Sequence, residues 1–133
     1  MLSKKKLLQI LKKIPESNWQ KAICDNGKFI QWLEIFQYIC PSTQLHHKFG
    51  LTNSGVWCCE WQGKVVSFDR NPLAFIVLIE SKQKEIVQLI RGSLMRSSLP
   101  ELVVTTFPLD ELLLFAISDS TYWKKYAEHW IED

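Results

Sequence analysis

The hydrophobic patterns of the chain predict an α+β fold, in which a small and mostly antiparallel sheet is covered by helices. Apolar residues recur at helical spacing near both ends of the chain, while β-branched and aromatic residues form short extended runs in its middle. Turn residues separate these segments. The 133 residues fit one domain, and no repeat or linker-like stretch divides them. We therefore expect a single compact domain over residues 1–133.

The chain begins with a pattern that favours helices. Ser3 can cap a first helix, whose apolar stripe follows the spacing i, i+3, i+4 and i+7. The stripe consists of Leu7, Ile10, Leu11 and Ile14. Pro15 ends this helix or starts a second, short one, which we expect to reach about Ile23 before the turn at Asp25-Asn26-Gly27.

Residues 28–40 fit either a helix or a strand. Their aromatic and β-branched content permits a strand, but a period of 3.6 fits the apolar positions better than strict alternation does. These positions are Phe29, Trp32, Leu33 and Phe36. We therefore expect a helix over 28–40, ended by Pro41-Ser42-Thr43, and a loop over 41–55.

Residues 56–61 and 64–68 predict two strands of a β-hairpin. Valine and aromatic side chains occur in both runs, and Gln62-Gly63 between them suits a tight turn. A second turn follows at Asp69-Arg70-Asn71-Pro72, because Asp, Asn and Pro all favour turn geometry.

The apolar run 73–79 predicts a third strand. A strand buried on both faces has a continuous apolar sequence of this length. Asn71-Pro72 would also start a helix well, but Ser81 provides a fresh N-cap for a helix that would reach about Arg91. We therefore expect a strand at 73–79 and then a helix.

Residues 102–107 alternate β-branched residues and predict a fourth strand. Pro108 then starts a helix, the chain breaks at Asp119 or Ser120, and a last helix presents one apolar side. That side consists of Trp123, Tyr126, Ala127, Trp130 and Ile131. Two helices joined by so short a break should pack as an antiparallel pair.

Positive charge is concentrated at the start of the chain. Residues 1–28 contain seven lysines and two acids, residues 100–133 contain two lysines and seven acids, and the net charge is +2. One face of the first helix is basic and consists of Lys4, Lys5, Lys6, Lys12 and Lys13. Such a face could hold nucleic acid through its phosphates. It contains neither an aromatic residue nor an arginine, however, and the acidic C-terminal part disfavours that class of partner.

The sequence gives no sign of export or of a membrane span. Its apolar runs are far shorter than the roughly 18–20 residues that cross a bilayer. No cleavage site for a signal peptide follows the first apolar stretch. The four cysteines lack the spacing of a secreted disulfide framework. We therefore expect a cytoplasmic protein with free thiols and no contact with membranes.

The chain contains no phosphate-binding loop and no recognisable catalytic motif. The only candidate metal ligands of interest are Cys40, His46, His47, Cys58 and Cys59. They lack zinc-site spacing, and two adjacent cysteines on a strand point to opposite faces. A catalytic thiol needs a cationic setting, which two neighbouring tryptophans and Glu60 do not supply. We expect no catalytic residue, no metal and no cofactor, although an enzyme assembled from residues that converge only in space stays an alternative.

Six tryptophans are an unusually high content for a chain of this length. Trp57 and Trp61 lie four residues apart on one predicted strand, so they share a face that is either core or presented to a partner. Burial in the core is favoured, because a small sheet must bury one face. If exposed, they would join a polar turn whose charges can steer a partner. The candidate partner-binding residues are Trp57, Trp61, Asp69, Arg70 and Asn71.

Part of the sequence resembles the central part of SUKH-type domains, which are widespread bacterial interaction and toxin-immunity modules. The shared features are a Trp-containing strand, Gly63 at a hairpin, Val65-Val66-Ser67-Phe68, an apolar strand, and Ser81 opening a helix. The resemblance spans residues 56–90 only. The N-terminal Pro-x-x-Tyr pattern of that family is absent, and its Asn-Gly-Gly turn is replaced by Asn26-Gly27. The resemblance implies a small protein-binding module.

The expected function is binding of another protein without catalysis, in an immunity-like or regulatory role. The first alternative is a nucleic-acid-associated protein that uses the lysine face of the first helix. The second is an enzyme without a recognisable motif.

Overall fold

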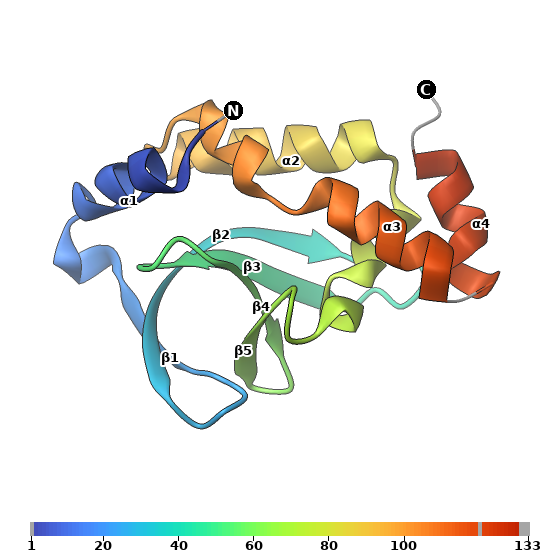
Figure 1. The fold of residues 1–133 in the computed structure, drawn as a ribbon, viewed down its shortest axis with the longest axis horizontal. Helices are drawn as coiled ribbons and strands as arrows, with labels where there is room; N and C mark the ends of the chain where they lie inside the picture. The colour runs from blue at the N-terminus through green and yellow to red at the C-terminus, as the bar shows by residue number, and fades with distance from the viewer. Residues whose placement is uncertain (1, 120, 131–133) are drawn as a thin grey trace.

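Five antiparallel strands form one sheet in the computed structural model, which describes residues 2–119 and 121–130. Their order in the sheet is their order along the chain, so each strand pairs with the next (Figure 1). The strands are β1 (Gln20–Ile23), β2 (Phe29–Ile39), β3 (His46–Thr52), β4 (Trp57–Trp61) and β5 (Lys64–Ser67). A meander of this kind needs only short connections between neighbouring strands.

Helices cover one face of this sheet (Figure 1). The α-helices of the described residues are α1 (Lys4–Lys12), α2 (Gln83–Arg96), α3 (Leu109–Asp119) and α4 (Thr121–Trp130). Short 3₁₀ segments link them: η1 (Glu16–Asn18), η2 (Pro72–Ala74), η3 (Ile76–Glu80) and η4 (Glu101–Thr106). The main core lies between the helices and the sheet, and rings of Phe36, Phe49, Phe75 and Phe107 meet at its centre.

The predicted α+β fold is confirmed, and so are the elements with local signals. Ser3 caps α1, since its hydroxyl accepts a hydrogen bond from the backbone N–H of Lys6 at 3.2 Å. The predicted hairpin is β4–β5. Helices α3 and α4 pack against each other as the C-terminal pair. Among the residues described, no helix combines the length and the apolar character that a bilayer crossing requires.

The helix expected over residues 28–40 is wrong, because this segment is the long strand β2. A β-bulge interrupts its pairing with β3 between Glu34 and Phe36, so one extra residue shifts the alternation of faces. Trp32 is buried on one face of β2, while Ile35 and Phe36 are buried in the main core on the other face. Because both faces are covered and the bulge shifts the alternation, the buried positions have the spacing i, i+3 and i+4, which imitates the period of a helix.

Two further expectations for the N-terminal half are corrected. Residues 15–23 form η1 and strand β1 rather than a second helix. The predicted loop over 41–55 contains β3, the central strand of the sheet. β3 contains two histidines, a lysine and a glycine, and it is extended because β2 and β4 pair with it on both sides.

The strands expected at 73–79 and 102–107 are both wrong. The first run forms η2 and η3, because Pro72 presets the first turn of η2 and Ile76, Leu78 and Ile79 are all buried. The second forms η4, in which Thr105 and Thr106 donate hydrogen bonds to carbonyls three residues earlier at 2.7 and 2.6 Å. The sheet therefore takes its other strands from the first half of the chain.

The predicted helix after residue 80 is α2, with different ends. It runs on to Arg96, and its N-cap is Lys82 rather than Ser81. The Ser81 hydroxyl lies 2.7 Å from the hydroxyl of Tyr38 on β2, so it links the start of α2 to the sheet instead of capping the helix.

The sheet curls so that β1 meets β5 on the side away from the helices (Figure 1). A single parallel bridge joins Cys24, after β1, to Val65 of β5. Trp32, Cys58 and Val65 fill the curl as a second, smaller buried group, which we call the inner cluster. The two faces of the sheet are thus packed separately, one by the helices and one by the inner cluster.

Candidate functional site

The turn after β5 forms a ridge, residues 67–71, between two open pockets. Within it, the backbone N–H of Arg70 donates to the Ser67 hydroxyl at 3.3 Å, and that of Asn71 donates to the Ser67 carbonyl at 3.0 Å. Asp69 and Arg70 are exposed, while Asn71 is half-buried. These bonds hold the tight turn that the Asp-Arg-Asn-Pro sequence predicts.

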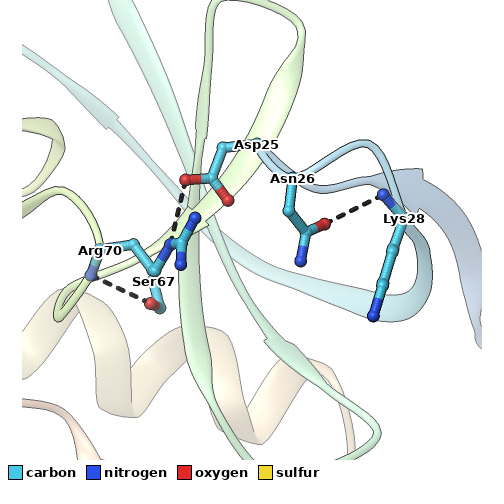
Figure 2. Close-up of polar contacts among 5 residues, drawn as sticks. All are labelled: Asp25, Asn26, Lys28, Ser67 and Arg70. Atoms are coloured by element: carbon cyan, nitrogen blue, oxygen red, sulfur yellow. Dashed lines mark hydrogen bonds and ion pairs between the residues drawn. The ribbon is translucent and has the colours of Figure 1, made fainter.

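Arg70 also ties the ridge to the turn between β1 and β2 (Figure 2). Its Nε atom donates to a carboxylate oxygen of Asp25 at 3.2 Å. In the same turn, the Asn26 side-chain oxygen accepts a hydrogen bond from the backbone N–H of Lys28 at 3.0 Å. The ion pair lies at the surface, where such pairs contribute little stability. The pair joins the ridge to the β1–β2 turn and leaves the Arg70 side chain exposed.

The pocket on the β5 side of the ridge brings together three of the five predicted partner-binding residues. It has a volume of about 360 Å³ and is lined by Asp25, Trp61, Gln62, Lys64, Val66, Arg70 and Asn71. Trp61 packs partly against the main core and also lines this pocket. An aromatic ring, a guanidinium and an amide thus line one open depression.

The pocket on the other side of the ridge contains Asp69 at its edge and Trp57 at its base. It measures about 270 Å³, and Lys4 and Glu111 also line it. Trp57 is only 4% exposed, and its indole N–H donates to the Thr106 hydroxyl at 2.8 Å. Trp57 is therefore a core residue. Of the five candidate partner-binding residues, the other four have surface open to solvent.

The lysine face of α1 is separate from the ridge except at Lys4. Lys5, Lys6, Lys12 and Lys13 are exposed, while Leu7 and Leu11 of the same helix are buried in the main core. Lys4 points toward the second pocket, and its ammonium donates to the Gly55 carbonyl at 3.3 Å. The basic face is thus the solvated side of an amphipathic helix.

Three of the four thiols are buried, and Cys24 is half-buried. Cys58 belongs to the inner cluster and Cys59 to the main core, so the two point to opposite faces of β4 as predicted. Burial raises the pKa of both thiols to about 12. Cys40 is also buried, and its Sγ atom donates to a Glu80 carboxylate oxygen at 3.1 Å. A thiol with so high a pKa as that of Cys58 or Cys59 is a poor nucleophile at neutral pH.

The histidines and carboxylates of the described residues do not form a cluster of metal ligands. Nowhere in residues 2–119 and 121–130 do three or more His, Cys, Asp or Glu side chains gather as metal ligands. His47 is half-buried, and its Nε2 atom has no hydrogen-bond partner among the described residues. Burial lowers the pKa of His47, which favours the neutral imidazole.

The buried thiols make the stability of the fold sensitive to alkaline pH. An unfolded cysteine ionises near its ordinary pKa of 9.0, whereas Cys58 and Cys59 in the fold ionise near 12. Their contribution to stability is complete below pH 9 and is lost as the pH rises toward 12, by up to about 1.4 kcal/mol per pH unit for each thiol. Urea unfolding at pH 8 and 10.5 measures this loss.

The Cys59→Ala variant is the control for that prediction. It removes one ionisable group, so its free energy of unfolding should fall less steeply with pH than that of the parent protein. Any constant penalty from the smaller side chain cancels, because only the pH slopes are compared. Equal slopes in the two proteins would show that the Cys59 thiol ionises as readily in the fold as in the unfolded chain.

Sequence reasoning missed the partner of Arg70. The sequence predicts Asp25-Asn26-Gly27 only as a turn, and nothing in it indicates that the carboxylate meets a guanidinium 45 residues later. Comparison with models of protein families, with curated proteins and with solved structures gives no match. The geometry of the chain is therefore the basis for assigning a function.

Proposed function

We propose that this protein is a binding module for another protein, acting without catalysis, and that the partner contacts the ridge 67–71 and Trp61. The observation that carries this proposal is the pocket in which Trp61, Arg70 and Asn71 meet. Tryptophan and arginine are among the residues most enriched at the energetic hot spots of protein interfaces.

Two features of the ridge support a role in binding. The Arg70 guanidinium is exposed even though it pairs with Asp25, so its charge can meet a partner of complementary charge. Asp69 and Arg70 present opposite charges on the two sides of the ridge, which can orient a partner of complementary charge during encounter.

The proposed setting is the cytoplasm, in an immunity-like or regulatory role. Free thiols suit a reducing compartment, and the four cysteines are all unpaired. Some of the features that resemble SUKH-type domains are present, namely the hairpin β4–β5 and the helix after Ser81. The apolar segment 73–79 is 3₁₀-helical instead, so the resemblance supports this role through fewer features than the sequence suggested.

Site-specific photo-crosslinking in the native host tests the proposal. A photoreactive amino acid at Asp69 on the ridge should give one discrete protein adduct, while the same probe at exposed Gln88 on α2 should not. The adduct should survive nuclease treatment. Similar adducts from both positions, or loss of the adduct after nuclease treatment, would contradict binding of a protein at the ridge.

Once the adduct identifies the partner, calorimetry with tryptophan variants measures the contribution of the pocket. Trp61→Ala should weaken binding at least tenfold, because truncating a hot-spot tryptophan costs about 2 kcal/mol or more. Trp19→Ala is the matched control, since Trp19 is also half-buried against the main core but does not line the pocket. An equal loss of affinity in both variants would indicate general destabilisation instead.

A further inference from the structure

Phe29 is an exposed aromatic residue that lies outside the ridge and next to a lysine. Phe29, the first residue of β2, is 63% exposed although its ring is large and apolar. The ammonium of Lys21 on β1 lies 4.2 Å from the centre of this ring. Lys21 therefore lies over one face of the ring, while more than half of the residue stays exposed.

Two amide residues line a pocket together with this ring. A pocket of about 250 Å³ is lined by Lys21, Phe29, Ile30, Gln31 and Asn53. The backbone N–H of Asn53 donates to the Gln31 carbonyl at 3.0 Å, which holds the two amide residues next to each other. Each amide side chain offers both donors and an acceptor, so the pair can read the polar edge of a flat heterocycle. The combination fits a nucleobase stacked on Phe29.

Positive charge continues from α1 along this flank of the molecule. Helix α1 and strand β1 lie on the same side in Figure 1, and η1 connects them. Exposed lysines occur along the whole segment, at positions 12, 13, 21 and 28. The two acids of the segment are Glu16 and Asp25, and Asp25 is paired with Arg70. Glu34 and Glu60 line a neighbouring pocket with Phe29, and Glu34 is paired with Lys48. The segment as a whole keeps a net positive charge, which favours polyanions.

From these observations we propose that the β1–β2 hairpin binds single-stranded nucleic acid. A base stacks on Phe29, Gln31 and Asn53 contact its edge, and Lys21 and Lys28 contact the neighbouring phosphates. A single strand is required, because the bases of a duplex already stack on each other and cannot reach an isolated ring. This site is independent of the ridge, and it supplies the aromatic residue that the lysine face of α1 lacks.

Fluorescence anisotropy with a labelled 15-nucleotide oligo(dT) and oligo(U) tests the proposal. Both should bind at about 50 mM salt and weaken steeply by about 300 mM, while a duplex of the same length should bind more weakly. Phe29→Ala should lower the affinity roughly tenfold, which is the effect of removing one stacked base. Phe29→Trp should retain it. Leu45→Ala is the matched control, because Leu45 is equally exposed on another hairpin.

Lysine variants separate the hairpin from the basic helix. Replacing Lys21 and Lys28 with glutamine should reduce the slope of log affinity against log salt by about 0.7 for each phosphate that is no longer neutralised. Replacing Lys5, Lys6, Lys12 and Lys13 should lower the affinity less than Phe29→Ala does. The proposal is overturned if neither oligonucleotide binds at the lower salt, or if duplex binds as tightly. It also fails if Phe29→Ala leaves binding unchanged while the α1 variant removes it.

Failure of the nucleic-acid proposal can be distinguished from failure of the protein-binding proposal at the ridge. The adduct expected at Asp69 should resist nuclease and should not require Phe29, so loss of oligonucleotide binding in Phe29→Ala should leave it intact. A nuclease-resistant protein adduct formed by a photoprobe at position 29 would instead assign this surface to a protein and overturn the nucleic-acid proposal.

Discussion

Replacing Gly50 with alanine is expected to destabilise the protein by at least about 3 kcal/mol. Gly50 lies on β3 beneath the ring of Trp32. A Cβ atom at this position would overlap the carbonyl oxygen of Leu33 and lie 2.7 and 2.8 Å from two ring carbons of Trp32. The Leu33 carbonyl belongs to the paired strand β2, so the clash cannot be relieved by turning a side chain. Thermal and urea unfolding measure the loss.

Gly92→Ala in α2 is the matched control for this substitution. The nearest atom to a Cβ at Gly92 is the tip of the Arg96 side chain, at 3.4 Å, and this flexible group can move. Alanine is also favoured over glycine inside a helix by about 1 kcal/mol. The control should therefore be as stable as the parent protein or more so. If the two variants have similar stabilities, close packing of Trp32 on Gly50 does not hold the inner cluster together.

Gly50 also shows why the curl of the sheet could not be predicted from the sequence. A glycine in a segment with histidines and a lysine indicates a loop by any local rule. Its actual role is to let the Trp32 ring approach the backbone of the neighbouring strand, which is a contact between residues 18 positions apart. Such a role becomes visible only when the pairing of β2 with β3 is known.

The parts of the fold that were predicted correctly depend on short-range interactions. The Ser3 cap, the β4–β5 hairpin, α2 and the C-terminal helix pair each involve residues close together in the sequence. The incorrect strands at 73–79 and 102–107 show the limit of this reasoning. An apolar run has the same composition whether it is a strand or a 3₁₀ segment. Here Pro72 is the first residue of one short helical turn, and Pro100 directly precedes another.

The candidate site was partly predictable for the same reason. The turn containing Arg70 has a strong local signal, and Trp61 lies beside it at the end of the hairpin. Trp57 points to the same face of β4 as Trp61 does. It is covered by η4, in which the Thr106 hydroxyl accepts a hydrogen bond from its indole N–H. Which of two tryptophans stays accessible thus depends on a segment some fifty residues later, and its position is not encoded locally.

Replacing Phe49 with alanine is expected to cost about 3–5 kcal/mol of folding free energy. Phe49 is fully buried on β3, next to Gly50, and its side chain points to the helical side of the sheet. Its ring stacks on that of Phe36 with centroids 4.8 Å apart, and it meets the rings of Phe75 and Phe107 edge-on at 5.3 and 6.3 Å. Alanine would remove all three ring interactions and leave a cavity between the sheet and the helices.

Phe29→Ala provides the matched control, because it removes the same side chain from an exposed position. Phe29 is 63% exposed, and its ring meets the exposed Lys21 ammonium, so its removal should change stability by no more than about 0.5 kcal/mol. Urea unfolding of both variants at pH 7 measures the difference. A Phe49 variant within about 1 kcal/mol of the parent protein would mean that the helices and the sheet do not share this aromatic core. A marked destabilisation of the Phe29 variant would mean that the exposed ring is part of the fold, and its free surface could then no longer be attributed to a ligand.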